Sequence, residues 1–110
     1  MKLLTRPEEF VLLAVWKLQQ DAYSLSIRKR LTEVTGHRWS LGSVYTPLDR
    51  LVRRGYLTSS ESEATAERGG RKKRIYRLTD LGRRQLIRVR TVEQAMWQGV
   101  TGLLPAGGAL

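Results

Sequence analysis

A cluster of cationic side chains around two adjacent glycines is the feature of this sequence that points most directly to a chemistry. Ten of the 20 Lys and Arg residues lie between Arg68 and Arg90, against one acid, Asp80. Residues 68–74 read Arg-Gly-Gly-Arg-Lys-Lys-Arg, and the two glycines let the backbone turn sharply and approach a charged surface. A basic hairpin tip of this kind binds anions, and nucleic acid is the first candidate partner.

A second candidate binding element is a helix that we expect to open at Ser40 or Ser43 and to end before Gly55. Its apolar residues share one face, since Val44 and Leu48 are followed by Leu51 and Val52 at helical spacing. The opposite face and its flank are polar, and we expect them to contact DNA through Ser43, Tyr45, Thr46, Asp49, Arg50 and Arg53. Such a helix fits a major groove about 12 Å wide.

Each of these residues has alternative roles. Arg50 or Arg53 could pair with guanine O6 and N7, or could contact only phosphates and solvent. Asp49 could accept a hydrogen bond from cytosine N4, but we favour a restraint on Arg53 one turn later. Tyr45 could donate to a phosphate or edge the core, and Thr46 could meet a phosphate or a thymine methyl group. Ser43 is first a helix cap and only second a phosphate ligand.

Two strands should flank the basic tip. We expect a strand over residues 56–63, a loop over 64–72 and a return strand over 73–79, where polar and apolar residues alternate. The hairpin contacts that we predict for DNA are Arg68, Gly69, Gly70, Arg71, Lys72 and Arg74. They could straddle a phosphate ridge or place an arginine in the minor groove, and the alternative is a solvated loop.

The remaining segments predict helices. Thr5-Arg6-Pro7-Glu8 is a capping box, so a helix should start near residue 6, and it is apolar on almost every side from residue 10 to residue 18. Ser24 can cap a second helix that buries Leu25, Ile27, Leu31 and Val34 and ends at Gly36. Thr79 can cap a last helix over residues 80–98.

This order of elements predicts a mainly α fold with a small β-hairpin. We expect a winged helix-turn-helix over residues 1–78, a long C-terminal dimerisation helix over 79–98 and an unassigned tail over 99–110. The first and last helices carry more apolar surface than one small domain covers, and a second copy would cover it. The predicted dimer interface comprises Phe10, Leu13, Leu86, Val89, Val92, Met96 and Trp97. Trp16 and Trp97 could instead line an effector pocket there.

Composition narrows the class of protein. A net charge of +10 favours nucleic acid, although an arginine-rich proteome or a ribosomal setting would also give it. Cysteine is absent and His37 is the only histidine, so we expect no metal and no cofactor. The apolar run over residues 10–16 is too short to span a bilayer, so we expect a cytoplasmic protein without a membrane partner. No nucleophile with a base, phosphate-cradling motif or pair of acids suggests an enzyme.

Three motifs in order resemble the PadR family of regulators. Residues 41–51, Leu-Gly-Ser-Val-Tyr-Thr-Pro-Leu-Asp-Arg-Leu, followed by Arg-Gly-Tyr-Leu at 54–57, resemble its recognition helix, although many members have proline where Thr46 stands. Residues 67–79, with Gly82 after them, are similar to its wing and the start of the next helix, and residues 22–27 to the opening of its second helix. The likeness covers roughly residues 4–90, and the single helix after the wing matches the short type.

The resemblance implies a dimeric transcriptional regulator, usually a repressor, that dimerises through its C-terminal and N-terminal helices. Some relatives bind planar aromatic ligands at the dimer interface. We therefore expect a homodimer on a pseudo-palindromic operator in double-stranded DNA. The alternatives are a winged-helix module for proteins or structured RNA, and a non-specific architectural DNA binder.

Overall fold

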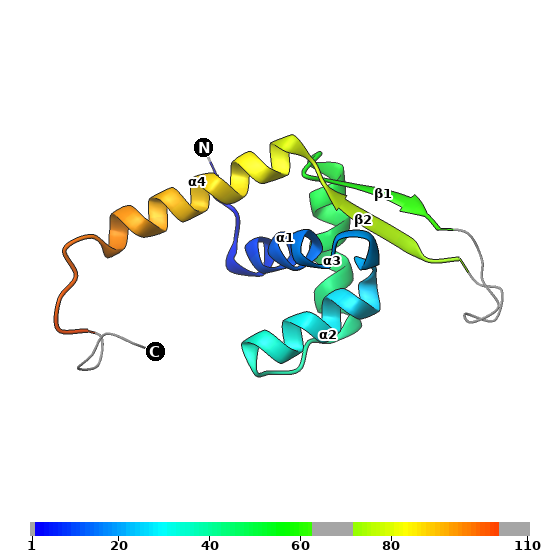
Figure 1. Cartoon of the computed structure of the whole chain (residues 1–110), viewed down its shortest axis with the longest axis horizontal. Coiled ribbons are helices and arrows are strands. Elements are labelled where there is room, and N and C mark those ends of the chain that lie inside the picture. The colour runs from blue at the N-terminus through cyan, green and yellow to red at the C-terminus, as the bar shows by residue number, and fades with distance from the viewer. Residues whose placement is uncertain (1, 63–71, 104–110) are drawn as a thin grey trace.

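The computed structural model describes residues 2–62 and 72–103, which form helices gathered at one end of a two-stranded hairpin (Figure 1). The elements in chain order are α1 (Arg6–Leu18), the short 3-10 helix η1 (Gln19–Asp21), α2 (Ser24–Thr35), α3 (Leu41–Arg53), β1 (Leu57–Glu61), β2 (Arg74–Leu78) and α4 (Asp80–Trp97). The predicted mainly α fold with a small hairpin is confirmed.

Local capping signals set most of the helix ends. Thr5 caps α1 in a full capping box with Glu8, and the Ser40 hydroxyl accepts from the Ser43 amide at 3.1 Å to open α3. Thr79 opens α4 in the same way through the Gly82 amide at 3.0 Å. Gly36 ends α2 with a left-handed φ of 78°, a conformation that glycine adopts without steric cost.

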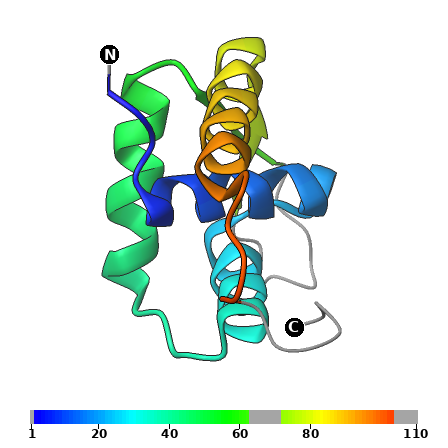
Figure 2. The same ribbon diagram turned by 90° about the vertical axis from the view of Figure 1, so that its left-hand side faces the viewer.

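The core lies where α1, α2 and α3 meet, and the hairpin closes one side of it. Its fully buried large side chains come from all of these elements: Val11, Leu12, Val15, Ile27, Val44, Leu48, Leu51 and Leu57. Figure 2 shows α1 crossing behind α4, with α3 upright to one side. Because α3 turns its apolar face into this core, its other face is left for solvent or a ligand.

The hairpin is tied to the core by its strand pairing and by one extra backbone bond. Its strands are antiparallel, with Leu57 opposite Leu78 and Glu61 opposite Arg74. The Tyr76 amide donates to the carbonyl of Ala22 at 2.8 Å, so the residue that follows η1 adds a backbone contact to β2. The Tyr76 side chain is buried, which fixes the face of β2 that turns inward.

Two residues that we expected to be buried in α2 are exposed. Leu25 is 57% exposed because it stands about 200° around the helix from Ile27 and therefore on the far side. Val34 shares the side of Ile27 but is 68% exposed, since it lies in the last turn. The expected cap was also wrong: Tyr23 is the cap residue and Ser24 is the first helical residue, with the Tyr23 amide donating to Ser26 Oγ at 3.0 Å.

The first turn of α4 packs so closely against Tyr56 and Leu78 that a larger residue at Gly82 should destabilise the protein. A Cβ at Gly82 would overlap the Tyr56 carbonyl oxygen and come within 2.8 Å of Leu78 Cδ1. We expect Gly82→Ala to lower the free energy of unfolding by about 1–3 kcal/mol or more, because backbone cannot move aside cheaply. Urea unfolding followed by circular dichroism measures this.

Gly42 in α3 is the matched control, since a Cβ there meets nothing within 4 Å. Gly42→Ala should be neutral or stabilise the protein by up to about 1 kcal/mol, because alanine loses less backbone entropy in a helix. Equal destabilisation by the two substitutions would contradict the steric explanation.

Candidate nucleic-acid interface

The outer face of α3 is polar and open. Thr46 and Asp49 are exposed, and the side chains of Asp49 and Arg53 each keep 78% of their accessible surface. Arg53 Nη2 lies 3.4 Å from Asp49 Oδ2, which is the pairing that their spacing predicts. Tyr45 is 49% exposed, and its hydroxyl lies 3.0 Å from Ser24 Oγ. Ser43 is exposed at the first turn, where its hydroxyl donates to the Ser40 carbonyl at 2.7 Å.

Pro47 lies inside α3 without ending it. The helix is continuous over Leu41–Arg53, and Pro47 is buried with the apolar face. Proline lacks an amide hydrogen, so one intrahelical bond in the first turns is missing. The polar face of α3 therefore lies on one continuous helix. This holds although Thr46 stands where the resembling PadR motif often has proline.

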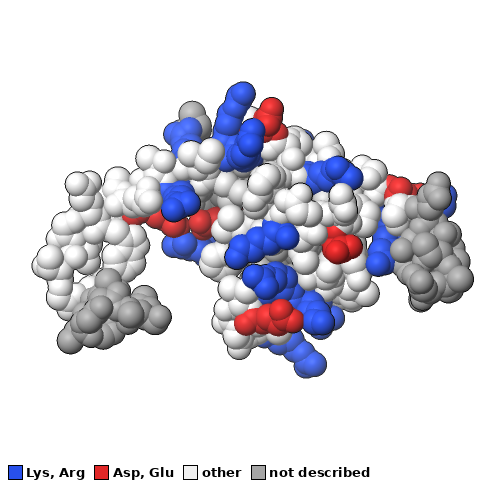
Figure 3. All heavy atoms as spheres, in the orientation of Figure 1, with Lys and Arg blue, Asp and Glu red and all other residues white. Residues whose placement is uncertain are grey.

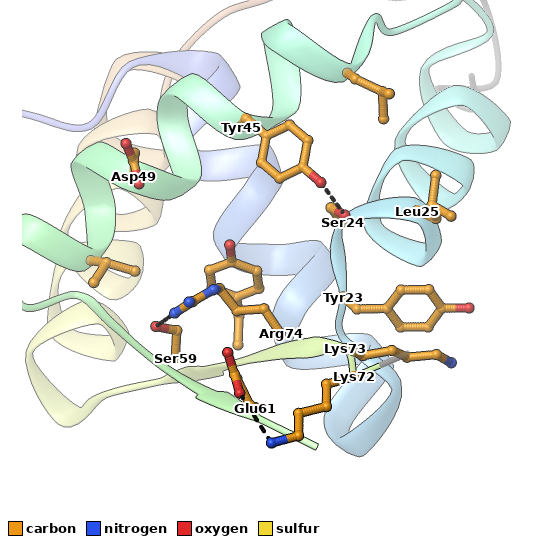
Figure 4. Close-up of a pocket in the computed structure, with 13 residues that line it drawn as sticks. Tyr23, Ser24, Leu25, Tyr45, Asp49, Ser59, Glu61, Lys72, Lys73 and Arg74 are labelled. Atoms are coloured by element: carbon orange, nitrogen blue, oxygen red, sulfur yellow. Dashed lines mark hydrogen bonds and ion pairs between the residues drawn. The ribbon is translucent and has the colours of Figure 1, made fainter. Parts of the chain in front are cut away.

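An open cleft of about 1180 Å³ separates α3 from the hairpin. One wall is the α3 face with Tyr45 and Asp49, and the other is the hairpin with Ser59 and Arg74. Figure 4 shows Tyr45 pointing across to Ser24 at the start of α2, while the basic side chains stand on the hairpin side. The cleft thus brings together four of the predicted contacts, Tyr45 and Asp49 from the helix and Lys72 and Arg74 from the hairpin, whereas Ser43, Thr46, Arg50 and Arg53 do not line it.

Three consecutive basic residues line the hairpin side of the cleft. Lys72 Nζ lies 3.8 Å from Glu61 Oε2, and both side chains are exposed. Lys73 Nζ lies 3.9 Å from the centre of the Tyr23 ring, and Arg74 Nη1 lies 3.1 Å from Ser59 Oγ. An exposed ion pair is worth little, so Lys72 can exchange its partner for an external anion at small cost.

Arg50 lies on the flank of α3 and points to α1 as well as to solvent. Its Nη1 lies 3.3 Å from Oε2 of Glu8, a side chain that is only 1% exposed. Arg54 Nη1 reaches the same oxygen at 3.1 Å. The Arg50 side chain still exposes 42% of its surface. Sequence reasoning assigned Glu8 only to the capping box, and no local signal indicated this long-range partner.

Two neighbouring carboxyl groups in α1 have opposite pKa shifts. Burial raises the pKa of Glu8, but hydrogen bonds from Thr5 and the charges of Arg54 and Arg50 outweigh it, and the net pKa is lowered. Burial and then the negative charge of Glu93 raise the pKa of Glu9, which is 8% exposed. Arg6 pairs with both Glu9 and Glu93, so the same turn of α1 also contacts α4.

Four of the predicted hairpin contacts, Arg68, Gly69, Gly70 and Arg71, lie outside the described residues. Lys72 and Arg74 are described, and both are exposed beside the cleft. Charge is not confined to the hairpin: in Figure 3, Lys and Arg also gather around the lower helices, whereas the C-terminal end of α4 is uncharged.

The residues predicted for a dimer interface divide into two groups. Val89 is 5% exposed and belongs to the chain's own core, with Phe10 and Leu86 packed against it. Leu13, Val92, Met96 and Trp97 are exposed, at 38%, 37%, 75% and 53%. Trp16 is 51% exposed on α1. A small apolar cavity of about 170 Å³ lies between α1 and α2, lined in part by Phe10, Leu13 and Val34.

Other site classes find no support in the part of the chain that is described. Residues 2–62 and 72–103 contain no group of three acidic or histidine side chains that could hold a metal ion. His37 stacks on Trp39 with ring centres 5.6 Å apart. None of the helices in those ranges combines the length and apolar character needed to cross a bilayer.

Comparisons with known proteins fit this geometry. Residues 12–88 match the transcriptional regulator PadR-like family. The chain belongs to this family. Members of the PadR-like family are transcriptional regulators and not enzymes, and the resemblance seen in the sequence is confirmed. A search of curated proteins found no match.

Solved structures show the same fold as this PadR-like chain. RosR of H. salinarum is 23% identical with a TM-score of 0.70, over 89% of this chain and 81% of that chain. A transcriptional regulator from Clostridium thermocellum is 17% identical with a TM-score of 0.70, over 90% of each chain. A PadR family regulator from Clostridium difficile is 19% identical with a TM-score of 0.63, over 86% of this chain and 88% of that chain.

The opposite pKa shifts of Glu8 and Glu9 predict opposite effects of neutralising them. The lowered pKa of Glu8 means that its carboxylate stabilises the fold above the ordinary value of 4.5, and that this contribution is lost as the pH falls through the lowered pKa. Glu8→Gln should therefore cost about 1–3 kcal/mol near neutral pH, and less in acid. Urea unfolding at neutral pH and at about pH 3 measures both values.

Glu9→Gln is the matched comparison one residue along. The raised pKa of Glu9 means that its protonated form suits the fold, so its contribution is present below 4.5 and is lost as the pH rises. A neutral glutamine should then stabilise the protein slightly at neutral pH and leave it unchanged in acid. Destabilisation by both substitutions at neutral pH would show that shape, and not charge, dominates at this turn.

Proposed function

We propose that this PadR-like regulator is a sequence-specific DNA-binding repressor that acts as a homodimer on a pseudo-palindromic operator in the cytoplasm. Each α3 enters a major groove, and each hairpin contacts the flanking backbone or minor groove. The observation that carries the proposal is the shared cleft: Tyr45 and Asp49 of α3 line one wall, and Lys72, Lys73 and Arg74 of the hairpin line the other. Repression follows because a dimer on a promoter excludes polymerase.

The chemistry of α3 and of the hairpin favours different roles for them on DNA. The hairpin supplies Lys72 and Arg74 to phosphates, with Arg68 and Arg71 and the backbone at Gly69 and Gly70 proposed from the sequence. Most protein–DNA hydrogen bonds go to the backbone and fix register, whereas base edges carry sequence information. In α3, Arg50 and Arg53 are the proposed readers of guanine. Ser43, Tyr45, Thr46 and Asp49 position the helix or its arginines.

The dimer rests on exposed apolar side chains that one chain leaves uncovered. α4 has 18 residues, and its C-terminal part carries Val92, Met96 and Trp97 into solvent. Phe10 and Leu13 on α1 border a second apolar surface. Pairing across a two-fold axis would remove both from water. Trp16 and Trp97 are each about half exposed on these elements, and a planar aromatic effector between them is our proposal for a ligand.

Selection of bound duplexes from a random pool at physiological salt tests the proposal. We expect a two-fold symmetric motif with half-sites about 34 Å apart. Affinity for that motif should fall roughly 10³–10⁵-fold between about 50 and about 200 mM salt, because six to ten phosphate contacts release counterions. No enriched motif and a shallow salt dependence would favour a protein or structured-RNA module. Equal affinity for selected and random DNA would favour an architectural binder.

The selected duplex then separates the proposed role of α3 from that of the basic segment. Arg50→Ala should reduce the preference for the selected sequence, since the lost contact is to a base edge. Arg71→Ala should weaken binding to every duplex alike, since the lost contact is to phosphate. If both variants behave in the same way, the proposed division of labour is wrong.

Oligomeric state is tested by charged substitutions on α4. Met96→Glu and Trp97→Glu should convert the dimer to a monomer in light scattering after size-exclusion chromatography, because a charge would be buried at the interface. Ile87→Glu is the control: Ile87 is 59% exposed, close to the 53% of Trp97, but at about 100° per residue it lies outside the stripe of Val89, Val92 and Met96. A dimer that survives both interface substitutions would contradict the assignment.

A further inference from the structure

Glu8 is a buried carboxylate with donors on both of its oxygens. Oε1 accepts from the Thr5 amide at 2.8 Å, and Oε2 accepts from Arg50 and Arg54 at 3.3 and 3.1 Å. The side chain is 1% exposed, so it cannot touch DNA itself. The capping box fixes the carboxylate at the first turn of α1, and this fixed group then restrains a side chain on α3.

One nitrogen of the Arg50 guanidinium group contacts Glu8, and part of the side chain is open to solvent. Its Nη1 faces Glu8, and 42% of the side chain is exposed on the flank of α3. A guanidinium group is planar and has five N–H donors in fixed relative directions, so a contact at one nitrogen restricts where the others point. Ordering a long side chain at an interface costs free energy, and a chain ordered before binding avoids that cost.

We propose that Glu8 is a positioning residue for sequence recognition: it orients the Arg50 guanidinium group before DNA arrives, so that the outer N–H donors meet a guanine edge. The inference rests on the proposed DNA-binding function and adds a specificity determinant that lies outside the DNA interface. Arg54 lies one residue beyond the end of α3 and donates to the same oxygen of Glu8 as Arg50 does.

Two other roles for Glu8 make different predictions. A purely structural role predicts that its loss weakens binding to all DNA by the same factor. A masking role, in which Glu8 neutralises Arg50, predicts that its loss strengthens binding to all DNA by the same factor. Only the positioning role predicts that loss of Glu8 lowers the preference for the selected duplex over other DNA. Binding to the selected duplex would weaken, while binding to other DNA would not.

The test measures affinities of the full chain for a selected duplex and for a scrambled duplex of equal length and base composition. We expect Glu8→Gln to reduce the ratio of the two affinities about tenfold, with scrambled-duplex affinity unchanged or modestly raised. Adding Glu8→Gln to Arg50→Ala should cause no further loss of the ratio, because the group to be positioned is gone. An unchanged ratio, or a second full loss in the Arg50→Ala background, overturns the inference.

Arg54→Gln is the matched control, since it removes the other ion pair of Glu8 and leaves Arg50 in place. It should keep the affinity ratio within about twofold, and a loss as large as that of Glu8→Gln overturns the specific link to Arg50. Circular dichroism at the assay temperature checks folding. If Glu8→Gln fails to fold, Glu8→Asp keeps the charge, shortens the reach to Arg50 and should lower the same ratio; an unchanged ratio overturns the inference.

The outcome also separates this inference from the proposed function. A wild-type chain that prefers no duplex overturns the proposed function itself. A wild-type chain whose preference depends on Arg50 but not on Glu8 keeps the proposed function and removes only the positioning role.

Discussion

The fold depends on how one buried carboxylate, that of Glu8, is neutralised. An ionised carboxylate taken out of water is costly unless charged and hydrogen-bonded partners surround it. Thr5 supplies the local donor, and Arg50 and Arg54 supply the charges from the far end of α3. The crossing of α1 over α3 is therefore held by a directional contact as well as by apolar packing, and directional contacts fix angles that packing leaves loose.

The same turn of α1 also contacts the C-terminal helix. Arg6 pairs with Glu9 within α1 and with Glu93 in α4. One short segment thus joins the helix that we place at a two-fold axis to the helix that we place in DNA. In a two-fold dimer, the distance between the two α3 helices follows from how α4 and α3 sit relative to each other in one chain. The first turn of α1 helps to set that relation.

Elements with local signals were predictable from the sequence. Capping residues and a left-handed glycine marked the helix ends, and the alternation in residues 74–78 marked β2, because caps and periodicity are properties of neighbouring residues. The exposed face of α3 and the Asp49–Arg53 pair follow from the same helical spacing. Helical periodicity wrongly predicted that Val34 is buried. Periodicity shows which residues share a helix face, but it does not show how far along that face the neighbouring helix extends.

The sequence did not predict the second set of contacts that Glu8 makes, beyond its role in the capping box. The capping box accounts for one oxygen of Glu8 and says nothing about the other, which lies beside side chains 42 and 46 positions away in the chain. A pairing of that range has no period and no motif, because it exists only after α1 and α3 pack. The proposed readers of DNA are on the surface and have local signals, whereas Glu8, which we propose orients one of them, is buried and is identified only from the packed fold.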